Sequence, residues 1–184
     1  AVAGANGIRI IHQEIILVPA RTIAANVFLG REIKNKFGFV DEKAMERETQ
    51  KVIDDLHLNL RADQLVENLS IGMQQLVEII KAVSAQAKIV VMDEPTSSLS
   101  QSEVETLFDI IRLLKKKGVG IIYISHRLEE LFTITDKIVV LRDGKMVGSV
   151  PTAEADKDEL IKMMVGRELT SYYTRNKHEI KGVS

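Results

Sequence analysis

The chain has 184 residues, 45% of them hydrophobic, and a formal net charge of −1 at pH 7. This composition is typical of a globular protein that forms one domain or part of a larger one, and no charge surplus favours nucleic acid or an anionic membrane as a partner. The absence of cysteine excludes disulfides and thiolate metal sites, and no apolar run approaches the length of a membrane span. Residues 1–7 lack a signal-peptide pattern and an initiating methionine, so we expect a cut end there rather than a natural start.

The first half of the chain predicts one short strand followed by helices. Residues 7–12 favour the strand, which leads into the polar residues His12, Gln13 and Glu14. A short helix is expected within residues 22–30, and Asp41 can cap a helix that runs to about Leu56. Ser70 can cap a second long helix, whose predicted apolar stripe comprises Met73, Leu76, Val77, Ile80 and Val83. We therefore predict a mainly helical insertion over residues 14–86.

The strand at residues 89–93 is the centre of the predicted fold. Its four consecutive apolar residues favour a strand buried on both faces of a parallel sheet, and Pro95 stops it. Parallel strands deliver their carboxyl ends to the crevice where α/β sheets bind ligands. Asp93 is therefore placed to hold Mg²⁺, and Glu94 to orient and deprotonate a water. Taken alone, these residues favour the alternative of a plain polar turn.

Helices and strands alternate in the second half. Ser100 and Glu103 predict a capping box for a helix whose core stripe comprises Val104, Leu107, Phe108, Ile111 and Leu114. Buried strands are expected at residues 119–125 and 137–142, with a short helix through Leu131 between them. This alternation predicts an α/β fold with a parallel-sheet core over about residues 87–150.

The end of the chain predicts three further features. Asp143-Gly144 favours a hairpin turn that returns the chain to Val150. Asp156 and Glu159 can cap a last helix, giving a C-terminal helical segment over about residues 156–166. Residues 171–184 are polar and weakly patterned, and we expect a linker or tail there.

Four motifs follow one another in an order that resembles the nucleotide-binding domain of ABC transporters. Gln13 follows the first strand, Ser70-Ile71-Gly72 opens a helix, Asp93-Glu94 ends the central strand, and His126 ends the next strand. The resemblance extends from about Gly7 to Arg167. It implies a partial P-loop NTPase (RecA-like) core with a helical ABC subdomain, forming a truncated ABC ATPase domain over residues 1–170.

This resemblance implies a role for each motif. Asp93 would be the Walker B Mg²⁺ ligand, Glu94 the catalytic carboxylate and His126 the switch histidine that links Glu94 to the γ-phosphate. Gln13 would be the Q-loop glutamine, which ligates Mg²⁺ or places the water.

The signature motif is implied at Ser70, Ile71 and Gly72. A helix N-terminus offers free backbone N–H groups and a positive dipole end to the γ-phosphate of ATP, and Gly72 allows close approach. Alone, Ser70 would be read as an ordinary helix cap.

Further matches resemble the first ATPase half of tandem monosaccharide importers of the ribose, galactose and xylose type. They include residues 11–14, 28–32, 70–79 and 164–168. The resemblance implies a peripheral protein at the cytoplasmic face of the cell membrane that hydrolyses ATP with Mg²⁺. Its implied partners are permease subunits, a second ATPase half or a homodimer partner, and indirectly a periplasmic or extracellular sugar-binding protein, but no nucleic acid.

The pattern G-x-x-x-x-G-K-[ST], which cradles phosphates in this family, does not occur in the sequence. We therefore expect the parent protein to be an ATPase and this chain alone to be inactive. One alternative is a non-catalytic module that lends Ser70–Gly72 to a partner's ATP site. A third class, a DNA-repair or translation ATPase, is disfavoured because its usual zinc-hook, coiled-coil or basic-arm insertions are missing.

Overall fold

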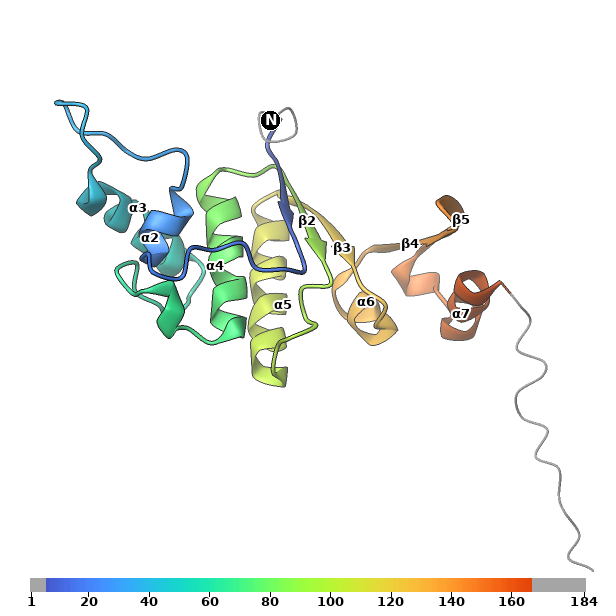
Figure 1. Ribbon diagram of the computed structural model, residues 1–184. Coiled ribbons are helices and arrows are strands. Elements are labelled where there is room, and N and C mark those ends of the chain that lie inside the picture. The colour runs from blue at the N-terminus through green and yellow to red at the C-terminus, as the bar shows by residue number, and fades with distance from the viewer. Residues whose placement is uncertain (1–5, 167–184) are drawn as a thin grey trace, which may run out of the picture. The chain divides into compact units, whose positions relative to one another are not determined.

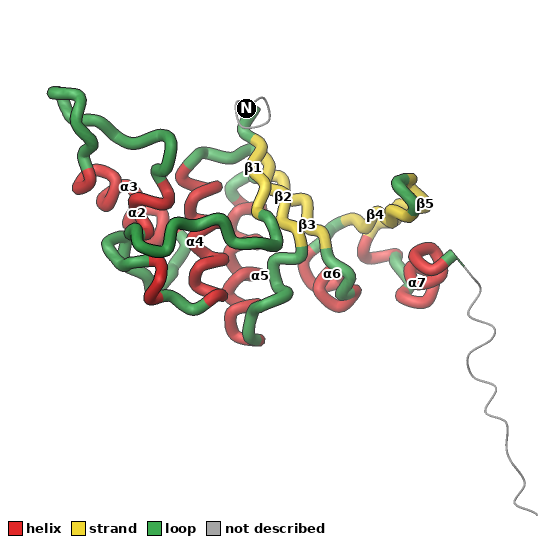
Figure 2. The backbone as a smooth tube through the Cα atoms, viewed as in Figure 1, coloured by secondary structure: helices red, strands yellow, loops and turns green. Residues whose placement is uncertain are grey.

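The computed structural model describes residues 6–166, which form two compact units divided between Glu130 and Leu131. The first unit contains a three-stranded parallel sheet in the order β1 (Ile8–Ile11), β2 (Ile89–Asp93) and β3 (Gly120–Ile124). Ile11 pairs with Met92, and Asp93 pairs with Ile124, so all three strands end at the same edge. Figure 2 shows these strands next to one another. This arrangement confirms the predicted α/β class and the central position of residues 89–93.

The helices of the first unit are α2 (Ile23–Val27), α3 (Glu42–Asp55), α4 (Ile71–Ser84), α5 (Gln101–Lys116) and α6 (Leu128–Ile134), the last of which crosses the boundary between the units. Of these, α3, α4 and α5 begin at the predicted caps Asp41, Ser70 and Ser100. The side chains of Thr22, Asp41 and Ser70 accept hydrogen bonds from backbone N–H groups of α2, α3 and α4. A single 3-10 turn, Val66–Asn68, precedes α4.

One face of the parallel sheet is covered by helices. Helix α4 packs against β1 and α5 against β3, and the two helices lie side by side (Figure 1). Val90 and Met92 of β2 point into this interface and are fully buried. Ile89 and Val91 of β2 are only partly buried, and Ile122 and Ile124 of β3 are about half exposed, so the prediction that the central and following strands are buried on both faces was wrong. Consecutive apolar residues cannot reveal whether a second layer covers the sheet.

The predicted apolar stripe of α4 was correct for its middle and wrong near its start. Leu76, Val77 and Ile80 are buried, whereas Met73 is 41% exposed. The buried face also includes Gln75, because α4 contacts α2, α3, α5 and β1 and is enclosed on several sides. The predicted stripe of α5 is buried at all five positions.

The second unit holds a separate antiparallel hairpin. Strands β4 (Lys137–Arg142) and β5 (Lys145–Pro151) join through Asp143-Gly144, as predicted, and α7 (Lys157–Val165) packs on β4. The expectation that residues 137–142 extend the parallel sheet was wrong, because the tight turn gives β4 a local antiparallel partner. The second 3-10 turn is Thr152–Glu154.

The caps of α7 confirm two further predictions. Asp156 accepts a hydrogen bond from the backbone of Glu159, and Gly166 closes the helix in the left-handed conformation. The predicted linker at residues 171–184 lies outside the described residues. None of the helices in residues 6–166 is long and apolar enough to cross a membrane.

Candidate functional site

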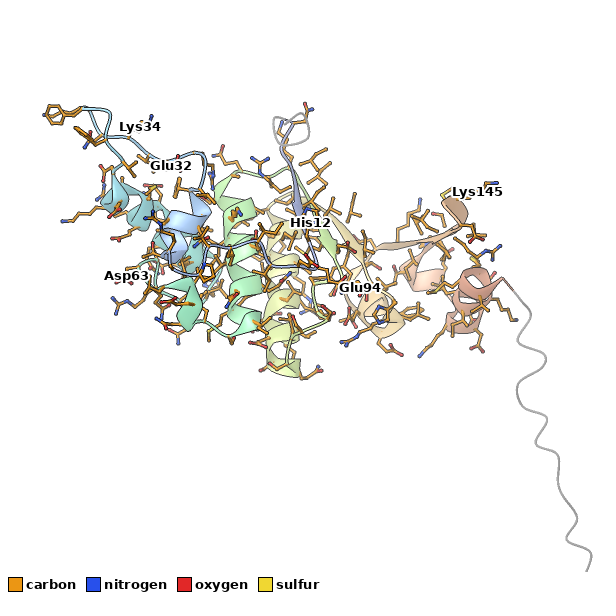
Figure 3. The ribbon with its side chains drawn as sticks, viewed as in Figure 1. His12, Glu32, Lys34, Asp63, Glu94 and Lys145 are labelled. Carbon is orange, nitrogen blue, oxygen red and sulfur yellow. The ribbon has the colours of Figure 1, made fainter. Side chains whose placement is uncertain are left out.

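The carboxyl edge of the parallel sheet brings together two of the predicted site residues. Glu94 follows β2 and His126 follows β3 by two residues, and Nδ1 of His126 lies 3.0 Å from Oε1 of Glu94. The side chain of Glu94 is 31% exposed and that of His126 is 67% exposed, so the pair is open to a ligand. When Nδ1 carries a hydrogen it donates to the Glu94 carboxylate, and the other ring nitrogen is an acceptor in the neutral ring and a donor in the protonated ring. Figure 3 shows Glu94 at the end of the sheet toward which β1 also runs.

Glu94 has an unusual backbone. Its φ is +44°, in the left-handed region that costs a non-glycine residue about 1–2 kcal/mol. Its N–H donates to the carbonyl of Ile124 at 2.9 Å, and its own carbonyl accepts from Ser97 at 3.2 Å. These bonds hold the strained residue between β3 and the turn after β2. Such strain directs the Glu94 side chain out of the strand, towards His126.

Asp93 and Gln13 lie at the same edge. Asp93 is the last residue of β2, and Gln13 lies two residues beyond the end of β1. Their carboxylate and amide oxygens are ligands that Mg²⁺ prefers, and Mg²⁺ is usually held by one or two carboxylates together with substrate phosphates. The described residues contain no group of three or more His, Cys, Asp or Glu side chains that could hold a metal without such a substrate. The available donors therefore fit a cation that arrives with phosphates.

Ser70, Ile71 and Gly72 form a separate part of the candidate site, at the start of α4. Ser70 Oγ accepts the backbone N–H of Met73 at 3.1 Å and donates to Oε1 of Glu103 at 3.0 Å. Ile71 is 56% exposed, while Gly72 is buried beneath the carboxylate of Glu103. A Cβ atom at Gly72 would lie 2.1 Å from that carboxylate, so glycine permits a contact that no other residue would.

Glu103 thus does more than cap its own helix. Its other oxygen, Oε2, accepts the backbone N–H of Ser100 at 2.9 Å and the Ser100 hydroxyl at 2.8 Å. Hydrogen bonds from the backbone and side chain of Ser100, and then from Ser70, lower the pKa of Glu103 below its usual value. The sequence predicts the capping box, but not the bond to Ser70, because a sequence separation of 33 residues gives no local signal.

A buried polar cluster behind Glu94 and His126 was missed at the sequence level. Glu130 is 7% exposed and accepts from Thr96, Tyr123 and Ser125. Burial, and then the Glu130 carboxylate, raise the pKa of Tyr123 above its usual value. The pattern of apolar and polar residues around Glu130 is that of an amphipathic helix, and it does not distinguish Glu130 from an exposed glutamate. Only the polar residues Thr96 and Ser125 next to the two motifs could have suggested a buried partner.

Asn26 was also missed. It is 1% exposed, its Oδ1 accepts the N–H of Val18 at 2.7 Å, and its Nδ2 donates to the Val18 carbonyl at 3.1 Å. Asn26 therefore fastens the segment that leads from Gln13 into the helices.

Comparisons with known proteins identify the family of this chain. Residues 3–97 match the family model described as "ABC transporter". The chain is 49% identical over 177 residues to "Ribose import ATP-binding protein RbsA" of Lactococcus lactis subsp. lactis (strain IL1403), and 48% identical to the protein of the same name from Lactococcus lactis subsp. cremoris (strain SK11). Each alignment covers 96% of this chain and 36% of the relative, so the chain spans about a third of the length of these relatives.

Solved structures share the fold. The ADP conformation of MJ1267, an ATP-binding cassette of an ABC transporter, aligns with a TM-score of 0.71 at 22% identity, covering 90% of this chain and 71% of that one. A metal-chelate-type ABC transporter in an inward-facing conformation aligns with a TM-score of 0.72 at 20% identity, covering 87% and 64%. The family match extends over more than half of the chain and includes β1, α4 and β2. The chain therefore belongs to the ABC transporter family.

Proposed function

We propose that this chain is part of the ATP-hydrolysing subunit of a monosaccharide importer, with ribose as the first sugar to test. The single observation that carries the ATPase proposal is the 3.0 Å contact between Glu94 and His126 at the carboxyl edge of the sheet. The choice of sugar import rests on the 49% identity to a ribose import ATP-binding protein. The implied partners are permease subunits, a second ATPase half or a second copy, and indirectly a sugar-binding protein, with the chain at the cytoplasmic face of the membrane.

The chemistry follows from the residues at the edge. Glu94 accepts a proton from the water that attacks the γ-phosphate, and the Nδ1–H of His126 holds the carboxylate in place. The exposed ring of His126 presents its second nitrogen to the substrate, and this nitrogen donates to a phosphate oxygen when both ring nitrogens carry hydrogen. Asp93 and Gln13 would hold Mg²⁺, which when bound neutralises phosphate charge. Ser70, Ile71 and Gly72 would contact the γ-phosphate of ATP held by the partner.

The test is ATP hydrolysis by the assembled transporter. Glu94→Gln keeps the shape of the side chain but removes the base, so we expect turnover to fall by roughly two to four decades while ATP binding is retained. His126→Ala should lower turnover less, because Glu94 remains. An exposed carboxylate on α5, Glu105, provides the matched control Glu105→Gln, which should leave turnover unchanged. Normal turnover in Glu94→Gln would remove Glu94 from the mechanism.

A second candidate is a non-catalytic module that lends its signature motif to another subunit. Exposure of Ile71 and Met73 on the first turn of α4 favours this possibility. The two candidates differ in one measurement. Mg-ATP binding by the chain supports the first, whereas stimulation of a complete partner without such binding supports the second.

A further inference from the structure

Glu130 is a buried carboxylate that neither candidate function assigns. Its side chain is 9% exposed. Oε1 accepts the Thr96 hydroxyl at 2.8 Å, and Oε2 accepts the Tyr123 hydroxyl at 2.8 Å and the Ser125 hydroxyl at 2.9 Å. Burying a charge costs free energy unless the charge is paired and hydrogen-bonded, so the Glu130 carboxylate needs these hydrogen bonds in order to be buried.

Two of these hydroxyl donors, Thr96 and Ser125, lie in the segments that carry Glu94 and His126. Thr96 lies two residues after Glu94, within the turn closed by the bond from Ser97 to the Glu94 carbonyl. Ser125 immediately precedes His126. Its hydroxyl oxygen also accepts the backbone N–H of Arg127 at 3.0 Å, so Ser125 holds the backbone on both sides of His126.

The remaining contacts fix Glu130 itself. Nη1 of Arg127 lies 3.4 Å from Oε1, one turn of helix away from it. The ring of Tyr123 packs edge-on against Phe108, with ring centroids 6.5 Å apart, so its hydroxyl is held in place. A glutamine would turn one of the two acceptor oxygens into a donor, so at least one hydroxyl would have to reverse and accept, and the stronger bonds to a charged carboxylate would be lost.

We propose that Glu130 is the positioning residue that sets the contact between Glu94 and His126, by anchoring the segment after β2 and the segment after β3 to one carboxylate. The expected effect of Glu130 on catalysis rests on the proposed ATPase function, whereas its effect on the distance between Glu94 and His126 does not. Glu130 touches neither reacting group, and acts through Thr96 and Ser125.

The geometric part is tested on this chain by long-range ¹H–¹⁵N NMR of its histidines, with Glu94→Ala as the reference for a lost contact. Glu130→Gln should shift the His126 ring nitrogens in the same direction as Glu94→Ala, and Thr96→Val should shift them less. Glu129→Gln, an exposed carboxylate on the same helix, should leave them unchanged. If Glu130→Gln fails to fold, Thr96→Val and Ser125→Ala still decide, because each removes one of the two donors through which Glu130 acts. Unchanged His126 signals in the folded variants would overturn the proposal.

The catalytic part is tested on the assembled transporter. Misplacing a reacting group by about 1 Å can cost about 10²-fold, so Glu130→Gln should lower kcat by roughly ten- to a hundred-fold while the KM for ATP stays within about two-fold. A merely structural role would instead lower the amount of active transporter and leave kcat per active site unchanged. Normal kcat in Glu130→Gln beside an inactive Glu94→Gln would refute this inference alone. Normal turnover in Glu94→Gln would refute the proposed function instead.

Discussion

Replacing Gly72 by alanine should have opposite effects on stability depending on whether Glu103 is present. An added Cβ would lie 2.1 Å from the Glu103 carboxylate, which is the end of a flexible side chain and can move away. The steric cost is therefore small, but moving the carboxylate breaks its bonds to Ser70 and Ser100. We expect these losses to cost about 1–2 kcal/mol in total, as for a lost helix cap and a charge-assisted hydrogen bond near water.

A second effect has the opposite sign. Alanine is favoured over glycine within a helix by about 0.5–1 kcal/mol. In the wild-type background, Gly72→Ala should therefore destabilise the chain by about 1 kcal/mol. In a Glu103→Ala background the carboxylate is already gone, so Gly72→Ala should stabilise by up to about 1 kcal/mol. The coupling between the two sites equals the cost of the lost bonds, about 1–2 kcal/mol, within the range for residues in contact.

The assay must report on the unit that contains α4. Urea unfolding gives the free energy of unfolding, and amide hydrogen exchange of α4 assigns the change to residues 6–130, since a chain of two units need not unfold in one step. Equal destabilisation by Gly72→Ala in both backgrounds would refute the reasoning. That result would mean that something other than Glu103 requires glycine at this position.

Further predictions follow from other contacts. The pKa of Glu103 is lowered in the folded chain. Its contribution to stability is therefore complete above its unfolded pKa and is lost as pH falls through the lower folded pKa. The difference in the free energy of unfolding between wild type and Glu103→Gln should accordingly shrink in acid. Asn26→Ala should destabilise by about 1–3 kcal/mol in urea unfolding, because it removes from a fully buried position the acceptor of the Val18 N–H, whereas the Val18 carbonyl keeps its bond from the Arg21 N–H; an effect near zero would contradict this. The pKa of Tyr123 is raised, so its phenolate absorbance should appear at a higher pH than that of an ordinary tyrosine; the signal is identified by its loss in Tyr123→Phe. The stability that Tyr123 contributes should fall as pH rises past its unfolded pKa. The family resemblance implies that residues 13–25 contact the permease, so in the assembled transporter a cysteine at the exposed position Ile16 should crosslink to the permease more than one at Glu105, and the reverse would exclude this contact.

Local patterns in the sequence predicted the elements well where the determining interactions are local. Caps at Asp41, Ser70 and Asp156 and the Asp143-Gly144 turn each depend on groups within a few residues, and all occur as predicted. Burial was predicted less well, because it depends on what packs from elsewhere. The apolar run of β3 gives no sign that Ile122 and Ile124 are about half exposed.

The candidate site was likewise predicted only in part. The contact between Glu94 and His126 is consistent with the role that the family resemblance implies for them, since each follows the carboxyl end of a neighbouring parallel strand. The partners of these residues were not predicted. Glu130 lies in an amphipathic helix, and no periodicity distinguishes a buried glutamate with four donors from a solvated one.

Glu103 and Glu130 both accept hydrogen bonds from hydroxyl groups at the candidate site, but Glu103 lies near water and Glu130 is buried. The loss of these bonds should therefore have different effects at the two positions. Each carboxylate collects hydroxyl donors from a segment that carries candidate site residues: Ser70 for Glu103, and Thr96 and Ser125 for Glu130. The bonds of Glu103 lie near water, so they can exchange for water at modest cost, and the start of α4 can rearrange when a ligand binds. Glu130 is buried, so removing one of its donors leaves a polar group without water to replace it. The contact between Glu94 and His126 should therefore be the rigid part of the site, and the start of α4 the adaptable part. Hydrogen exchange should accordingly be slower for the backbone amide of Glu94, which is bonded to Ile124, than for that of Met73, which is bonded to the exposed Ser70 hydroxyl.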